Sequence, residues 1–379
     1  MAGPILIGGR SRNRQNLAQA GCRRRRFDLD GRCHLDLETE ATGRLSPELL
    51  GGHRYRSKPV GLLASLALIG LLVACSNAEP IEETTREIIE FESIDLPGTL
   101  WDPFMPPPAD GEPVTIEGRL TMPPTDEPVP LVVLTHGCGG IGSGEIGWVS
   151  FLERNGVATL LVDSFAGRGI KSLCSGDETM NVASVVVDVY RAARAVADHP
   201  FVDDDHIAVM GLSYGGRAAL WSALTRFQDL YDGEEFAAHV AFYPSTCFIQ
   251  LEEGTDVTGG PISIFHGTAD DWTPIDQCRD YVSRLVTAGV DASILEYEDA
   301  RHGFDDSSIQ TSELAVDVLS PRNCSFVEVD SRIVDVATGR PAGIRSPCVR
   351  LGAHIGYDEA ARDRARADLL SLFEQVFDQ

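Results

Sequence analysis

The sequence has no C-x-x-C pair, few basic residues beyond position 58, and no uncharged apolar run that reaches the ~20 residues of a transmembrane helix. The missing cysteine pairs argue against a structural zinc site. Of 32 basic and 57 acidic residues, 20 and 51 follow position 58, which gives this part of the chain a formal charge of −31. Such a charge repels nucleic acid and other anionic polymers, so we expect no nucleic-acid partner and attribute the excess to solubility.

The N-terminal region predicts an exported chain. Residues 1–58 hold 12 basic and six acidic residues without sustained apolar periodicity, and we interpret them as a leader or a disordered segment. They are unusually long for the charged part of a signal peptide, which is consistent with a true start further along the chain. Residues 59–75 contain an apolar run sized like the core of a signal peptide.

The apolar run ends in Leu-Val-Ala-Cys at 72–75, which resembles the lipobox of bacterial lipoproteins. We therefore expect Cys75 to be lipidated and to hold the mature chain at a membrane, facing the periplasm or the cell exterior. A plain membrane anchor or an uncleaved signal is the alternative.

The remaining cysteines fit this location, because an even set outside the reducing cytosol indicates disulfides. Six cysteines allow 15 pairings, and the spacing alone selects none of them. They are Cys138, Cys174, Cys247, Cys278, Cys324 and Cys348.

Short apolar runs alternate with helical patterns beyond residues 76–112, an acidic, proline-rich stretch that predicts a tether with one edge strand near 91–96. The predicted strands are 114–120, 131–134, 158–162, 207–210, 240–243, 262–265 and 292–297. The predicted helices are roughly 146–155, 181–198, 216–227, 275–288 and 358–377. This alternation predicts an α/β fold with a mostly parallel sheet and helices on both faces.

A pattern of strand, sharp turn and helix centres on Gly-Leu-Ser-Tyr-Gly at 211–215, the G-x-S-x-G signature of a nucleophile elbow. A serine held in a strained turn needs neighbours without Cβ atoms where the strand and the helix crowd together, and the two glycines meet that need. Ser213 is therefore the candidate nucleophile. Ordinary glycine-rich turns also contain such a pattern, so the case depends on the residues at the neighbouring strand ends.

Polar groups suited to acyl transfer follow several of these strands, and the carboxyl ends of parallel strands lie at one edge of a sheet. Asp270 and His302 each follow a strand, and with Ser213 they keep the order serine, acid, histidine of α/β-hydrolases. The histidine would activate the serine and the carboxylate would fix the histidine tautomer. Asp271 is the main alternative for the acid, and His354 is the other histidine downstream of it.

Two backbone N–H groups are expected to stabilise the oxyanion. One belongs to Tyr214, which follows the nucleophile. The other comes from the glycine-rich loop after the strand 131–134, where Cys138 is the preferred donor and Gly139 the alternative.

Several ordered motifs give the chain a family resemblance. The block 131–304 is similar to the dienelactone hydrolase family, particularly to its exported members. The motifs are H-G-C-G-G at 136–140, V-D-S-F at 162–165, G-L-S-Y-G-G at 211–216, D-D-W-T-P at 270–274 and H-G-F-D at 302–305. The resemblance implies an α/β-hydrolase fold over 113–379, hydrolysis through an acyl-enzyme without cofactor or metal, and a triad of Ser213, Asp270 and His302.

One departure from the family concerns the nucleophile. The namesake enzymes carry cysteine where this chain has Ser213, which shifts the expected substrate from a lactone to a general carboxylic ester, with lactones still admitted. The implied fold also suggests the disulfides Cys138–Cys174, Cys247–Cys278 and Cys324–Cys348. The segment 311–357, before the last helix, is longer than the family's usual link and is expected to shape or cover the site.

Two other functions fit part of the pattern. A prolyl-oligopeptidase-like serine peptidase shares the elbow and the triad order, but it normally carries a propeller domain for which the N-terminal region has no room. A catalytically silent binding lipoprotein on the same fold is the alternative outside enzymes, and the complete triad spacing argues against it. The expected partners are a small ester or lactone and, through the lipid anchor, a membrane; the sequence indicates no oligomeric state.

Overall fold

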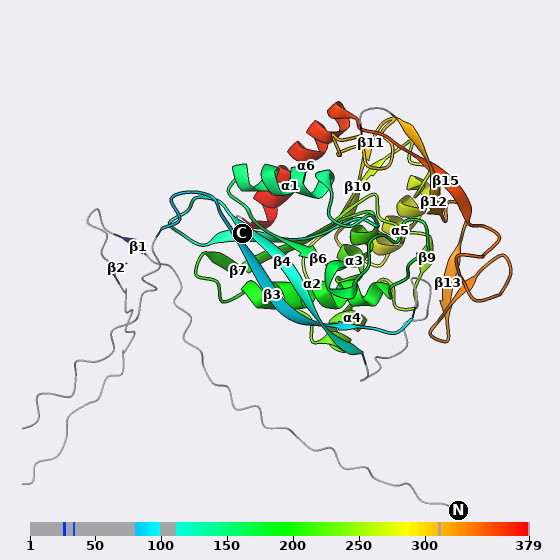
Figure 1. Cartoon of the computed structure of the whole chain (residues 1–379), viewed down its shortest axis with the longest axis horizontal. Helices are drawn as coiled ribbons and strands as arrows, with labels where there is room; N and C mark the ends of the chain where they lie inside the picture. The colour runs from blue at the N-terminus through cyan, green and yellow to red at the C-terminus, as the bar shows by residue number, and fades with distance from the viewer. Residues whose placement is uncertain (1–25, 28–32, 35–79, 99–110, 310–311, 378–379) are drawn as a thin grey trace, which may run out of the picture. The chain divides into compact units, whose positions relative to one another are not determined.

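The computed structural model describes residues 26–27, 33–34, 80–98, 111–309 and 312–377, in two separate units (Figure 1). In the unit Met1–Leu72, β1 (Arg26–Phe27) pairs antiparallel with β2 (Cys33–His34). The apolar run 60–74 and Cys75 lie outside the described residues. None of the described helices is both long and apolar enough to cross a membrane.

The unit Val73–Gln379 contains an eight-stranded sheet in the order β11-β10-β8-β7-β5-β6-β4-β3. All neighbours from β11 to β6 are parallel, and β4 runs antiparallel to both β6 and β3. The strands are β3 (Thr85–Asp95), β4 (Glu112–Met122), β5 (Val129–Thr135), β6 (Ala158–Asp163), β7 (Val202–Leu212), β8 (His239–Phe242), β10 (Ile262–Gly267) and β11 (Ala292–Tyr297). The predicted mostly parallel sheet of an α/β-hydrolase fold is confirmed.

Helices cover both faces of this sheet, which explains why its central strands are apolar without alternation. On β5, Leu131 and Val133 join the core beneath α2, α3 and α5, whereas Val132 and Leu134 join the core beneath α1 and α6 (Figure 1). The helices are α1 (Ser143–Arg154), α2 (Val182–Val196), α3 (Tyr214–Trp221), α4 (Thr225–Tyr231), α5 (Ile275–Thr287) and α6 (Glu359–Phe377).

Two expectations about elements need correction. The single helix expected at 216–227 is two helices, α3 and α4, because Leu224 between them is extended and bridges to Val257. The edge strand expected near 91–96, within the stretch 76–112, is present as β3 but begins earlier, at Thr85; it pairs with β4 along its whole length and buries Phe91 and Ser93. Residues 76–79 and 99–110 of that stretch lie outside the description.

The segment 311–357 adds two small sheets. β12 (Glu313–Ser320) pairs with β15 (Arg350–Ile355), and β13 (Phe326–Val329) lies between β14 (Arg332–Asp335) and β9 (Ile249–Gln250). The structure contains the three expected disulfides, Cys138–Cys174, Cys247–Cys278 and Cys324–Cys348.

Candidate active site

The turn between β7 and α3 places Ser213 in a strained backbone conformation, with φ of 52° and ψ of −104°. A Cβ on Gly211 would lie 2.1 Å from the carbonyl oxygen of Gly215, and a Cβ on Gly215 would lie 2.5 Å from that of Thr135. The Thr135 hydroxyl donates to the Gly215 carbonyl at 3.1 Å, so β5 also supports the turn. Glycine is therefore required at both positions for steric reasons.

The three residues predicted from strand ends lie within hydrogen-bonding distance of one another. Ser213 Oγ is 2.9 Å from His302 Nε2, and His302 Nδ1 is 2.8 Å from Asp270 Oδ2. His302 and Asp270 are buried, whereas Ser213 is partly exposed. This arrangement can transfer a proton from the serine hydroxyl to the imidazole.

Asp270 is held as an anion by its surroundings. Burial disfavours its charged form, but the interaction with the His302 charge and hydrogen bonds with His266 and His302 outweigh burial and hold the Asp270 pKa well below its ordinary value. The backbone N–H groups of Trp272 and Thr273 donate to Asp270 Oδ1 at 2.8 and 2.9 Å. The carboxylate is thus fixed in position as well as in charge.

Asp271, the alternative acid, makes its contacts with His354 and not with His302. Its carboxylate accepts from the backbone N–H of His354 at 2.7 Å and lies 2.8 Å from His354 Nδ1. The structure therefore pairs the two alternatives, Asp271 and His354, with each other and leaves Asp270 to His302.

The loop after β5 lies beside Ser213 and is braced by a buried carboxylate. Glu145, in the first turn of α1, accepts from Gly137 N–H at 3.1 Å with one oxygen and from Gly142 N–H at 2.8 Å with the other. Cys138 and Tyr214 both line the cavity that contains Ser213. The disulfide ties the same loop to Cys174, which also lines the cavity.

A second buried set of side chains, Tyr243, Trp148 and Asp305, packs near His302. The ring of Tyr243, a residue with φ of 36°, lies 4.6 Å from the His302 ring, centroid to centroid. The Tyr243 hydroxyl and the Trp148 indole N–H each donate to Asp305 at 2.5 Å. Burial, only partly offset by these hydrogen bonds, raises the pKa of Asp305.

A cavity of about 460 Å³ opens beside Ser213. Its catalytic side is formed by Cys138, Ser213, Tyr214 and Trp272, and its far wall is formed mainly by 338–347 of the long segment. Charged groups in the lining are Glu178, Arg217, Arg340 and Arg345, and burial lowers the pKa of Arg217 to about 10. Across the part of the chain that the structure describes, no three His, Cys, Asp or Glu side chains are grouped as a metal site.

Sequence reasoning missed several of these supporting residues. Glu145 lies three residues after Gly142, as the acid of a capping box would, but glycine has no side chain to complete the box, so the sequence did not single Glu145 out. Tyr243, Trp148 and Asp305 come from three distant parts of the chain, and no local pattern joins them.

A family model matches most of the chain. The model of the family described as "Dienelactone hydrolase family" matches residues 116–377, from β4 to the end of α6. Dipeptidyl peptidase 4 of Felis catus is 29% identical over 188 residues, which are 42% of this chain and 24% of that protein. Prolyl endopeptidase FAP of Bos taurus is 25% identical over 202 residues, 45% of this chain and 25% of that protein. The chain thus spans about a quarter of the length of these curated relatives.

Among solved structures, a promiscuous dienelactone hydrolase-like phosphotriesterase from metagenomic libraries matches with a TM-score of 0.45 and 17% identity, covering 78% of this chain and 99% of that one.

Proposed function

Because the chain belongs to the dienelactone hydrolase family, we propose that it hydrolyses carboxylic esters, lactones among them, through an acyl-enzyme formed on Ser213. The observation that carries the proposal is the hydrogen-bonded series from Ser213 to His302 to Asp270, with distances of 2.9 and 2.8 Å. The order of these residues along the chain fits the same chemistry.

In the first half of the reaction, Ser213 Oγ attacks the ester carbonyl carbon while His302 Nε2 takes the hydroxyl proton. His302 then gives this proton to the departing alkoxide, and the alcohol leaves. In the second half, His302 takes a proton from water, the hydroxide attacks the acyl-enzyme, and Ser213 recovers its proton as the acid departs. Asp270 stabilises the imidazolium in both halves, because its lowered pKa keeps it charged.

The negative charge that forms on the carbonyl oxygen is stabilised in this proposal by the N–H groups of Cys138 and Tyr214. Removing one such donor typically costs ~10²–10³-fold in kcat. Glu145 would keep the Cys138 donor in place, because it holds the neighbouring Gly137 N–H at 3.1 Å. The cavity beside Ser213 has a volume suited to a small substrate.

The test is a panel of p-nitrophenyl acetate, p-nitrophenyl butyrate and a five-membered lactone, assayed with wild type and with Ser213→Ala. The variant should lose about 10⁴- to 10⁶-fold in kcat. Ser283→Ala, on the exposed side of α5, is the matched control and should behave as wild type. Ester turnover that persists in a folded Ser213→Ala chain would sink the proposal.

A peptidase is the second candidate, favoured by the 29% identity to dipeptidyl peptidase 4 over 188 residues. A peptidase should cleave the chromogenic substrate Gly-Pro-p-nitroanilide faster than the esters of the panel, whereas an esterase should cleave the esters faster. A catalytically silent binding protein would turn over neither substrate and would leave Ser213 unlabelled by a fluorophosphonate.

The three disulfides indicate an exported chain. We further propose that Cys75 carries the lipid that anchors it, on the strength of the Leu-Val-Ala-Cys sequence at 72–75. Radioactive palmitate fed to expressing cells should label wild type and spare Cys75→Ser. Equal labelling of the two would exclude this anchor.

A further inference from the structure

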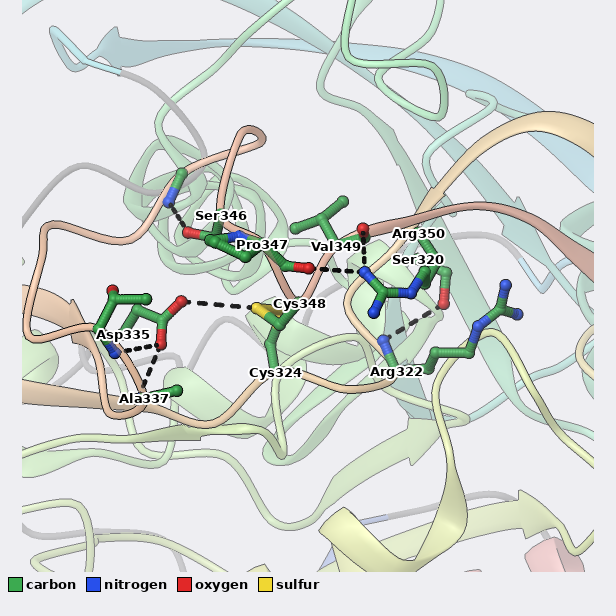
Figure 2. The surroundings of a disulfide bond; sticks show 12 residues. Ser320, Arg322, Cys324, Asp335, Ala337, Ser346, Pro347, Cys348, Val349 and Arg350 are labelled. Atoms are coloured by element: carbon green, nitrogen blue, oxygen red, sulfur yellow. Dashed lines mark hydrogen bonds between the residues drawn. A yellow bond between two sulfur atoms is a disulfide. The ribbon is translucent and has the colours of Figure 1, made fainter.

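The segment 311–357 is fastened to the domain at several points. The Cys324–Cys348 disulfide closes it on itself, beside Asp335, whose carboxylate also accepts from the backbone N–H of Ala337 (Figure 2). The buried carboxylate of Glu328 on β13 receives two hydrogen bonds from Arg226 of α4, at 2.6 and 2.8 Å. These ties make the segment a fixed support for whatever packs against it.

The segment 311–357 contacts the loop that carries Asp270. The next residue, Asp271, accepts from the backbone N–H of His354 on β15 at 2.7 Å and lies 2.8 Å from the ring Nδ1 of the same residue. Arg322, which follows β12, donates to the Asp271 carbonyl at 2.9 Å. We call the antiparallel pair of β12 and β15 the β12–β15 ribbon. The carboxylate of Asp271 is held by this ribbon, and the carbonyl of Asp271 is held by Arg322, which follows β12.

Trp272 continues this contact. Its indole N–H donates to the Leu319 carbonyl at 2.9 Å, and its own carbonyl accepts from the Ser320 hydroxyl at 2.9 Å. The Trp272 ring lies 4.6 Å from the His302 ring, centroid to centroid. The ribbon therefore reaches the base through Trp272 as well as the acid through Asp271.

The loop that carries His302 is held by the same ribbon directly. His302 forms a parallel bridge with Ile355, and the N–H of Gly356 donates to the His302 carbonyl at 3.1 Å. The acid and base loops come from different parts of the chain, and β15 contacts both. Between β14 and β15, residues 338–347 form the far wall of the cavity.

We propose that the β12–β15 ribbon is a clamp that fixes the acid loop against the base loop, and that Asp271 is its principal positioning residue. This rests on the proposed ester hydrolysis at Ser213. Asp271 makes no hydrogen bond to His302 and does not itself line the cavity, so it acts through its chain neighbours Asp270 and Trp272.

The predicted consequence separates rate from stability. The Asp271 and His354 side chains are 38% and 44% exposed, and a contact between side chains this exposed contributes little to stability. A misplacement of about 1 Å in a reacting group, however, can cost ~10²-fold in rate. The clamp should therefore matter for kcat far more than for unfolding.

The experiment compares Asp271→Ala, Asp271→Asn and a control, Asp203→Ala, on p-nitrophenyl acetate. Asp271→Ala should lower kcat by about 10- to 100-fold with little change in KM. Asp271→Asn should recover most of the loss, because its amide oxygen still accepts from the His354 N–H. Asp203→Ala removes a similar pair, 2.8 Å from His206, at the far end of β7, and should leave kcat unchanged.

Ser213→Ala is measured in parallel to separate the two proposals. Activity that persists in Ser213→Ala overturns the proposed function. Two results overturn the clamp alone, provided that Ser213→Ala is inactive. One is a wild-type kcat in Asp271→Ala, and the other is a fall in kcat in Asp203→Ala as large as in Asp271→Ala. If Asp271→Ala does not fold, His354→Ala replaces it. His354→Ala should lower kcat by a smaller factor, because its backbone N–H stays in place, and wild-type kcat in that variant counts against the clamp.

Discussion

Replacing Glu145 by glutamine tests whether the loop after β5 is held by a carboxylate. Both carboxylate oxygens are used, one by Gly137 N–H at 3.1 Å and one by Gly142 N–H at 2.8 Å, and the side chain is only 6% exposed. Glutamine has one oxygen, so one backbone N–H would face an NH₂ group and lose its acceptor. The substitution changes one functional group and almost no volume.

The magnitude follows from that lost contact. A buried donor left unsatisfied costs about 1–3 kcal/mol, and the surviving hydrogen bond loses the strength that a charged acceptor gives it. We expect the free energy of unfolding to fall by about 2–3 kcal/mol. Because Gly137 precedes the expected donor Cys138, kcat/KM should also fall by about 10- to 100-fold.

Urea unfolding measures the first quantity, and initial rates on p-nitrophenyl acetate measure the second. Glu153→Gln is the matched control on the same helix, because its partner, the Thr84 hydroxyl, can donate equally well to an amide oxygen. Unchanged stability and rate in Glu145→Gln, or equal losses in Glu153→Gln, would refute the reasoning.

Three further predictions concern the surroundings of the triad. The Asp305 pKa is raised in the folded state, so its contribution to stability is present at low pH and lost as the pH rises through that value. In urea titrations from pH 4 to 8, Asp305→Asn should therefore gain stability relative to wild type as the pH rises, and a constant difference would contradict this. Replacing Cys138 and Cys174 by serine should lower the unfolding free energy by about 2–4 kcal/mol and also lower kcat; a stability loss with wild-type kcat would show that the disulfide is not needed to position the Cys138 N–H. Gly211→Ala would place a Cβ 2.1 Å from a backbone carbonyl oxygen, so it should abolish activity or folding, and a fully active variant would contradict the elbow geometry.

Local patterns were enough to predict the sheet and the position of each candidate catalytic residue. Apolar runs buried on both faces identify central strands, and Ser213, Asp270 and His302 each lie in the turn or loop that follows one. The sequence favours Asp270 over Asp271 as the acid but leaves the choice open, because both follow the same strand. It depends on His354, which reaches Asp271 only through the pairing of β12 with β15.

The contacts that support the triad could not be predicted from the sequence either, because they join residues that are far apart along the chain. Asp305 receives hydrogen bonds from Trp148 and Tyr243, residues separated from it by 157 and 62 positions. The long segment 311–357 was expected to shape or cover the site, and its residues 338–347 do line the cavity. Its strands could not be assigned beforehand, because their partners, such as β9, are short and carry no periodic signal.

The most direct measurement is the mass of the protein after reaction with a fluorophosphonate, followed by peptide mapping. The account predicts one adduct per chain, located on Ser213, no adduct in Ser213→Ala, and slow labelling in a folded His302→Ala chain. An adduct on another residue, or a folded wild-type chain that takes up no label, would contradict the assignment of Ser213 as the nucleophile.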